Sequence, residues 1–313
     1  MDNKEKYSIM TNRKNRSIVE RSAEIIFSAC GLITVLAVIS ITAYMLMNGT
    51  PALFEVGIKE ILFSSVWEPA NKTNPQFGIL YIILTSIVGT AFAILIGVPI
   101  GILTAVFIAE VAPKKVAKIV KPAIELLAGI PSVIYGLLGL MILNPLMYKL
   151  ELMIFKDSET HTFTGGANLI SAVLVLAIMI LPTVINISES SLNAVPRQLK
   201  SSSLALGASQ IQTIFKVMIP AAKSGIISAV VLGVGRAIGE AMAITLVSGS
   251  SVNMPLPFNS VRFLTTAIVS EMGYASSLHR QVLFTIGLVL FIFIMMINIT
   301  LSRILKSGGK EDV

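Results

Sequence analysis

The sequence has few charged residues and almost none of the residues that form disulfides or bind metal ions. Asp, Glu, Lys and Arg make up 13% of 313 residues, about half of the roughly 25% found in soluble domains. The single cysteine, Cys30, excludes a disulfide-stapled secreted domain. With only two histidines, a structural metal site is not expected either. The 54% hydrophobic content and mean hydropathy of +0.83 exclude disorder and leave the class of polytopic membrane proteins.

Motifs for nucleotide hydrolysis are also missing. The phosphate-binding pattern G-x-x-x-x-G-K-[ST] does not occur, and its closest fragment, Gly308-Gly309-Lys310, lacks the first glycine and the final hydroxyl residue. We therefore expect a chain that is not an enzyme and binds no cofactor of its own. If its activity needs ATP and magnesium, another chain must use them. The net charge of +7 is interpreted as membrane topology, not as nucleic-acid binding.

Long apolar runs predict an all-α protein with six membrane-spanning helices. A span needs about 20 mostly apolar residues. The expected spans cover roughly residues 25–47, 77–109, 126–148, 166–188, 224–248 and 281–302. They form one transmembrane domain over residues 25–302, preceded by a segment over 1–24 and followed by a tail over 303–313.

Lysine and arginine predict the orientation of these spans. Seventeen of them lie in the N-terminal segment, the second and fourth connections and the tail, and six lie in the remaining connections. Because the cytoplasmic side carries the excess, both termini are predicted to be cytoplasmic. The first apolar run is too long for a signal-peptide core of about 7–15 residues, so we expect it to be an uncleaved span.

Two of the predicted outer connections have distinctive features. The first contains the only tryptophan, Trp67, which we expect to anchor at the membrane interface. The connection over residues 249–280 is the longest and could dip partly into the protein.

The fifth span contains two charged residues, Arg236 and Glu240. An arginine near the bilayer centre costs about 2.5–3.5 kcal/mol on insertion scales, so it should face the bundle interior or a water-filled cavity. In a continuous helix, Glu240 lies one turn further on the same face. Two interpretations follow. The residues could form an ion pair that locks helices together, or Arg236 could present donors to an anion in a transport pathway while Glu240 orients it.

Small residues surround this pair. Gly233, Gly235 and Gly239 would allow another helix to approach closely, and they could also leave room for a solute.

The cytoplasmic connection over about 189–223 is too polar to span a membrane but has apolar residues at helical spacing. We expect two short helices on either side of Gly207, ending at Pro220. Two roles stay open, an amphipathic hairpin lying on lipid headgroups and a coupling element inserted into a partner.

The spacing within this connection resembles the EAA loop of bacterial ABC importer permeases. Nine residues follow Gly207 before a Val-Met-Ile-Pro sequence, as in that loop. Three serines stand where the family has E-A-A, and the family's acidic residue there helps to dock the ATPase. The predicted coupling residues are Ser201, Ser202, Ser203, Leu206, Gly207, Ala208, Val217, Ile219 and Pro220.

A second stretch of sequence makes the resemblance more specific. Gly233-Val-Gly-Arg-Ala-Ile-Gly-Glu-Ala-Met-Ala243 is similar to the corresponding stretch of phosphate-specific permeases, and the resemblance extends from about Glu20 to Arg303. The first outer connection is more similar to the PstC-type subunit than to its PstA-type partner.

The resemblance implies a type I ABC importer permease in the bacterial inner membrane. It implies a second permease (PstA-like), an ATPase dimer (PstB-like) that uses ATP and magnesium, and an extracytoplasmic phosphate-binding protein (PstS-like). Phosphate would be the substrate, with membrane lipid around the chain and no nucleic acid as partner. The alternatives are a permease for molybdate or sulfate, and a non-translocating scaffold or sensor in a phosphate-signalling complex.

Overall fold

The computed structural model describes residues 3–71 and 73–308, with side chains described over 20–71, 73–300 and at Arg303. Part of the expected N-terminal segment (1–2) and of the tail (309–313) therefore lies outside the described residues. The described chain is mostly helical, with connecting loops and a two-stranded antiparallel hairpin of β1 (Trp67–Glu68) and β2 (Gln76–Phe77). The predicted all-α class is confirmed.

The helices follow one another with short connections. Their bounds are α1 (Asn3–Ala52), α2 (Ile58–Phe63), α3 (Leu80–Val106), α4 (Lys114–Ala128), α5 (Ser132–Leu138), α6 (Asn144–Ile154), α7 (Leu169–Asn193), α8 (Arg197–Ala205), α9 (Gln210–Thr213), α10 (Ile219–Ala221), α11 (Lys223–Gly239), α12 (Met242–Val247), α13 (Leu264–Glu271) and α14 (Ser277–Gly308). The π-helical turns are η1 (Leu53–Gly57), η2 (Phe107–Val111), η3 (Gly139–Leu143) and η4 (Ile214–Met218).

Several described helical stretches are long and apolar enough to cross a membrane. They are Glu20–Phe63, Leu80–Val111, Ser132–Ile154, Leu169–Asn193 and Ser277–Thr300. A further candidate is the pair Gln210–Ala221 and Lys223–Gly239, whose axes meet at 71°. Counting this pair as one gives six candidates, the number expected from composition, although only its second member lies in the predicted span over 224–248.

Two predicted spans begin later in the structure than expected. The third starts at Ser132, not near residue 126, because Pro131 immediately precedes α5 and separates it from α4. The fourth starts at Leu169, because Asn168 is extended and its side chain caps the helix by accepting from the Ser171 N–H at 3.1 Å, after a turn with positive φ at Gly165 and Gly166. Charge-free runs locate apolar segments but do not detect such breaks.

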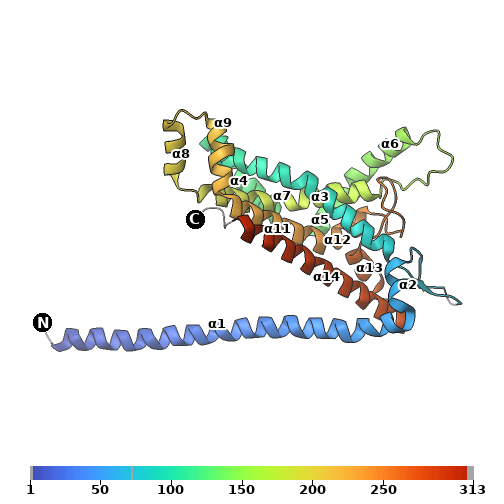
Figure 1. Cartoon of the computed structure of the whole chain (residues 1–313), viewed down its shortest axis with the longest axis horizontal. Coiled ribbons are helices and arrows are strands. Elements are labelled where there is room, and N and C mark those ends of the chain that lie inside the picture. Colours follow the sequence, from blue (N-terminus) through green and yellow to red (C-terminus); the bar gives the residue numbers. More distant parts are fainter. Residues whose placement is uncertain (1–2, 72, 309–313) are drawn as a thin grey trace.

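The centre of the molecule is built from α3, α7 and α11 (Figure 1). Two glycines of α3 allow the close approach of α7. A Cβ at Gly97 would lie 2.9 Å from the Ala177 carbonyl oxygen, and one at Gly101 would lie 2.8 Å from Val184. The long helix α1 stands apart along most of its length, and its C-terminal part packs on α14 (Figure 1). Cys30 lies on the exposed part of α1.

The elongated molecule has two different ends (Figure 1). One end carries α8 and α9, together with the first residues of α1 and the last residues of α14. The opposite end carries α6, α13 and the β1–β2 hairpin. We call these the α8–α9 end and the β1–β2 end.

The contact between α3 and α7 generates a stability prediction. Gly97→Ala should lower the free energy of unfolding by about 1–3 kcal/mol, because the added methyl group must push a backbone carbonyl away. The measurement is thermal unfolding of the purified protein in detergent. Gly31→Ala is the control, since a Cβ there meets nothing within 4 Å and should raise stability slightly. Equal thermal midpoints for wild type and Gly97→Ala would contradict the close contact.

Candidate functional site

The fifth predicted span is interrupted beside its charged residues. Helix α11 ends at Gly239, Glu240 has an extended conformation with ψ of 130°, and α12 begins at Met242. Three glycines within seven residues favour this break, because each lowers helix stability by about 1 kcal/mol relative to alanine. The continuous helix expected over 224–248 is therefore wrong.

The side chain of Glu240 stabilises the start of the next helix. Its Oε1 accepts a hydrogen bond from the backbone N–H of Ala243 at 3.0 Å. A carboxylate is favoured there because the first N–H groups of a helix carry partial positive charge. The backbone carbonyl of Glu240 accepts a second bond, from Thr265 Oγ1 at 2.7 Å. Both ends of the interrupted backbone are thus held by side chains.

Arg236 does not pair with Glu240. The Glu240 carboxylate is directed to the start of α12 instead, and no ion pair joins the two side chains. Within the described chain, the guanidinium has one hydrogen-bond partner, Thr183 Oγ1 of α7 at 3.5 Å. A guanidinium has five N–H donors, so half-buried Arg236 has donors to offer a ligand or another chain.

The three glycines of this region lie in different surroundings. Gly233 is buried, and a Cβ there would lie 3.0 Å from Val184 of α7, so it permits helix packing. Gly235 and Gly239 are exposed, and a Cβ at either would meet nothing within 4 Å. The break therefore lies at a surface that this chain leaves open beside Arg236.

At the α8–α9 end, two helices flank a glycine turn, as the sequence predicts. Gly207 has a φ of 87°, a conformation that glycine adopts without strain. The next helix begins with a capping box between Ser209 and Gln212. Glu110 of η2 holds both helices, because its carboxylate pairs with Lys200 of α8 and its carbonyl accepts from Gln210 of α9.

The predicted coupling residues differ in exposure. Ser201 and Ser202 are exposed on α8, whereas the Ser203 hydroxyl lies 2.9 Å from that of Thr213. Leu206 is 89% exposed. The remaining residues surround the turn or follow it: exposed Gly207 and Pro220, and partly covered Ala208, Val217 and Ile219.

Large apolar side chains around this turn point outward. We call them the α8–α9 apolar surface, and its members are Leu199, Leu204, Leu206, Ile211 and Phe215. Clustered exposed apolar residues on a polar hairpin are typical of an interaction surface.

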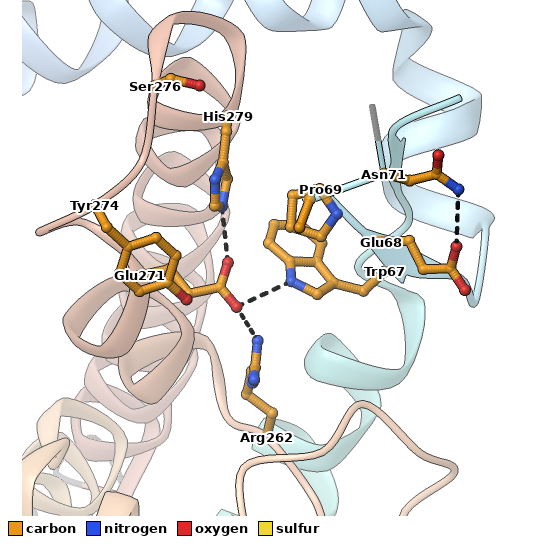
Figure 2. Close-up of a pocket in the computed structure, with 10 residues that line it drawn as sticks. Trp67, Glu68, Pro69, Asn71, Arg262, Glu271, Tyr274, Ser276 and His279 are labelled. Carbon is orange, nitrogen blue, oxygen red and sulfur yellow. Dashed lines mark hydrogen bonds and ion pairs between the residues drawn. The ribbon is translucent and has the colours of Figure 1, made fainter. Parts of the chain in front are cut away.

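The β1–β2 end contains a polar cluster that the sequence analysis missed (Figure 2). Glu271, 4% exposed, accepts hydrogen bonds from Trp67 Nε1 at 3.2 Å and from His279 Nε2 at 2.7 Å, and it pairs with Arg262. We call these four residues the Glu271 cluster. They border a cavity of 540 Å³. Desolvation raises the pKa of the neighbouring Tyr274 phenol above its usual value, the Glu271 charge adds to this, and Arg262 opposes it.

Half-buried Trp67 thus has a hydrogen-bond partner within the protein, a contact that the sequence analysis did not predict. One signal could have identified the cluster, since Glu271 is the sole acidic residue between Glu240 and Glu311. A second buried carboxylate, Glu151, is held separately by His161 Nε2 at 2.8 Å. Among the described residues, no group of three or more His, Cys, Asp and Glu side chains could hold a metal ion.

Comparisons with known proteins match this architecture. A family model described as binding-protein-dependent transport system inner membrane component matches residues 97–307. A probable ABC transporter permease protein of Bacillus subtilis, YqgH, is 38% identical and covers 97% of this chain and 99% of its own. The phosphate transport system permease protein PstC of Pasteurella multocida is 32% identical, over 96% of this chain and 97% of its own. PstC of Haemophilus influenzae is 34% identical, over 78% and 79%.

A solved structure supports the fold. An inward-facing MetNI methionine ABC transporter chain aligns with a TM-score of 0.51 at 19% identity, over 74% of this chain and 94% of that chain. The family match includes the α8–α9 hairpin, the break at Glu240 and most of the Glu271 cluster. The chain belongs to the family of inner-membrane components of binding-protein-dependent transport systems, which are membrane-spanning, non-catalytic transport subunits.

Proposed function

We propose that this chain is one of two permease subunits of an ATP-driven phosphate importer. The observation that carries the proposal is the half-buried guanidinium of Arg236, which is not neutralised by Glu240 and lies beside an open break in the fifth span. Relatives that align over nearly the whole chain and are named phosphate permeases support phosphate as the anion.

Arg236 would bind phosphate through parallel N–H···O bonds, for which its planar fork is suited. Thr183 Oγ1 can accept a bond from the guanidinium and hold it in place. Glu240 would keep the break open by capping α12 instead of competing for the arginine. The exposed Gly235 and Gly239 leave space beside the anion.

The other subunits of the proposed importer would bind to three different surfaces of this chain. A second, PstA-like permease would cover the open surface beside Arg236, and a PstS-like binding protein would deliver phosphate at the β1–β2 end. A PstB-like ATPase pair would dock on the α8–α9 apolar surface and would bind the ATP and magnesium. The α8–α9 end and both termini would then be cytoplasmic, in agreement with the excess of lysine and arginine there. The membrane is the bacterial inner membrane.

One prediction concerns the role of Arg236 in phosphate uptake. In proteoliposomes with the full importer, Arg236→Ala should lower phosphate uptake by about 100-fold or more, because truncating one member of a buried charge pair costs about 2–5 kcal/mol. Arg236→Lys should recover part of the loss, since lysine keeps the charge but not the fork. Arg303→Ala near the end of α14 is the control and should transport normally.

Normal uptake by an assembled Arg236→Ala importer would refute a role in the pathway. Competition by unlabelled anions tests the substrate in the same assay. Stronger suppression of labelled phosphate uptake by sulfate or molybdate than by an equal excess of unlabelled phosphate would favour another oxyanion. An importer that responds to binding protein but transports no anion would favour the scaffold or sensor alternative.

Another prediction concerns docking of the ATPase on the α8–α9 apolar surface. Leu206→Asp should weaken retention of the ATPase subunit on the purified permease pair by about tenfold, because a charge replaces a side chain that becomes buried on docking. The measurement is binding of the ATPase to the immobilised pair. Leu256→Asp, an exposed position in the loop at the opposite end, should bind normally. Unchanged ATPase binding by Leu206→Asp would place the docking site elsewhere.

A further inference from the structure

Helix α13 connects the Glu271 cluster to the break in the fifth span. Its last residue is Glu271, the centre of the cluster (Figure 2). Near its other end, Thr265 Oγ1 donates to the Glu240 carbonyl at 2.7 Å, and Leu264 N donates to Ser86 Oγ of α3 at 2.9 Å. Eight residues at 1.5 Å each place the two ends about 12 Å apart. One short helix therefore touches both the outer cluster and the backbone next to Arg236.

The N-terminal half of α13 is tightly packed inside the protein. Leu264 is 1% exposed, and Thr266 and Ala267 are fully buried. Thr266 Oγ1 also accepts from the backbone N–H of Phe263, which fixes the start of the helix. Close-packed interiors transmit displacements instead of absorbing them. We therefore expect α13 to move as a rigid body.

The two ends of α13 contact different parts of the chain. The Glu271 cluster joins β1, the loop before α13 and the first turn of α14 through one buried carboxylate. The Glu240 peptide lies in the non-helical break and is followed by the short helix α12. A shift of α13 would therefore displace the Glu240 peptide and the end of α11 that carries Arg236.

We propose that α13 is a mechanical link between the outer face and the anion-binding arginine. Docking of the binding protein at the 540 Å³ cavity displaces Trp67 and Glu271, and α13 carries this displacement to the break, where it repositions Arg236. Glu271 and Thr265 act as positioning residues and do not contact the anion. The proposal rests on the proposed function, because that function supplies the docking partner.

The experiment uses the complete importer in nanodiscs and compares ATPase rates with and without phosphate-loaded binding protein. Thr265→Val removes the hydroxyl donor to Glu240 at nearly constant volume, and Glu271→Gln removes the charge that holds Arg262. Each should lower the stimulation ratio by about fivefold, the effect of losing one typical hydrogen bond. The ratio is measured at saturating binding protein, and basal ATPase activity and assembly should stay at wild-type levels.

The chain offers a matched control for each substitution. Thr285 is 1% exposed and donates to the Gly49 carbonyl at 2.7 Å, but it joins α14 to α1. Glu151 is fully buried and also binds a histidine, but it lies in α6. Thr285→Val and Glu151→Gln should keep the wild-type stimulation ratio. If they reduce it as strongly as the α13 variants, general loss of packing explains the effect and the link is wrong.

The double variant Thr265→Val/Glu271→Gln gives a second test that does not depend on the size of either effect. Because both residues act through one helix, the double variant should be no more impaired than the worse single variant. Fully additive losses would mean two independent defects and would overturn the link.

A labelling experiment separates failure of the link from failure of the proposed function. Gly239→Cys in a Cys30→Ser background places a thiol at the open side of the break. Thr265→Val should change its rate of reaction with a maleimide, and Thr285→Val should not, without any substrate or binding protein. Equal labelling rates would overturn the link even in an importer that transports phosphate. A wild-type importer that takes up no phosphate would refute the proposed function alone.

Discussion

The structure depends on one constraint, that a helix interrupted within a membrane must satisfy its freed backbone groups inside the protein. Here the interruption is at Glu240, and two side chains meet the requirement. The carboxylate of Glu240 accepts from the Ala243 N–H, and the Thr265 hydroxyl donates to the Glu240 carbonyl. Thr265 can reach that carbonyl only because the third outer connection enters the protein and places α13 against the break. The connection that contains α13 is thus part of the framework that holds the break.

The same constraint explains why Arg236 is left unpaired by its neighbour. In a continuous helix, Glu240 would neutralise the arginine one turn away. Once the helix is broken, the carboxylate is needed at the start of α12, and the guanidinium keeps only a long bond to Thr183. A cation in an apolar environment is costly without a counter-charge. In the proposed importer, the transported anion itself would supply that counter-charge, so binding of the substrate and stabilisation of the arginine would be one interaction.

Sequence reasoning identified features that depend on neighbouring residues and missed those that depend on distant ones. Apolar run lengths indicate the spans, and the interval from Gly207 to Pro220 locates the α8–α9 hairpin. The sequence analysis missed the break at Glu240. The apolar character of residues 224–248 does not show where side chains can replace backbone hydrogen bonds. The sequence analysis also missed the partners of Glu271, because one of them, Trp67, lies 204 residues away in the chain. No local pattern reports such a contact.

At each end of the molecule, one glutamate with a buried carboxylate holds a surface motif together. Glu110 holds α8 and α9, and Glu271 holds the β1–β2 hairpin, the loop before α13 and the start of α14. At Glu110 the carboxylate holds α8 and the backbone carbonyl holds α9, whereas at Glu271 all these bonds go to the carboxylate. Moving a donor away from either carboxylate would leave a buried charge without it. Helix α11 starts beside the hairpin and ends at the break, where α13 begins its path to the outer cluster. In the proposed importer, ATPase motion at one end and docking at the other would therefore converge on the same peptide.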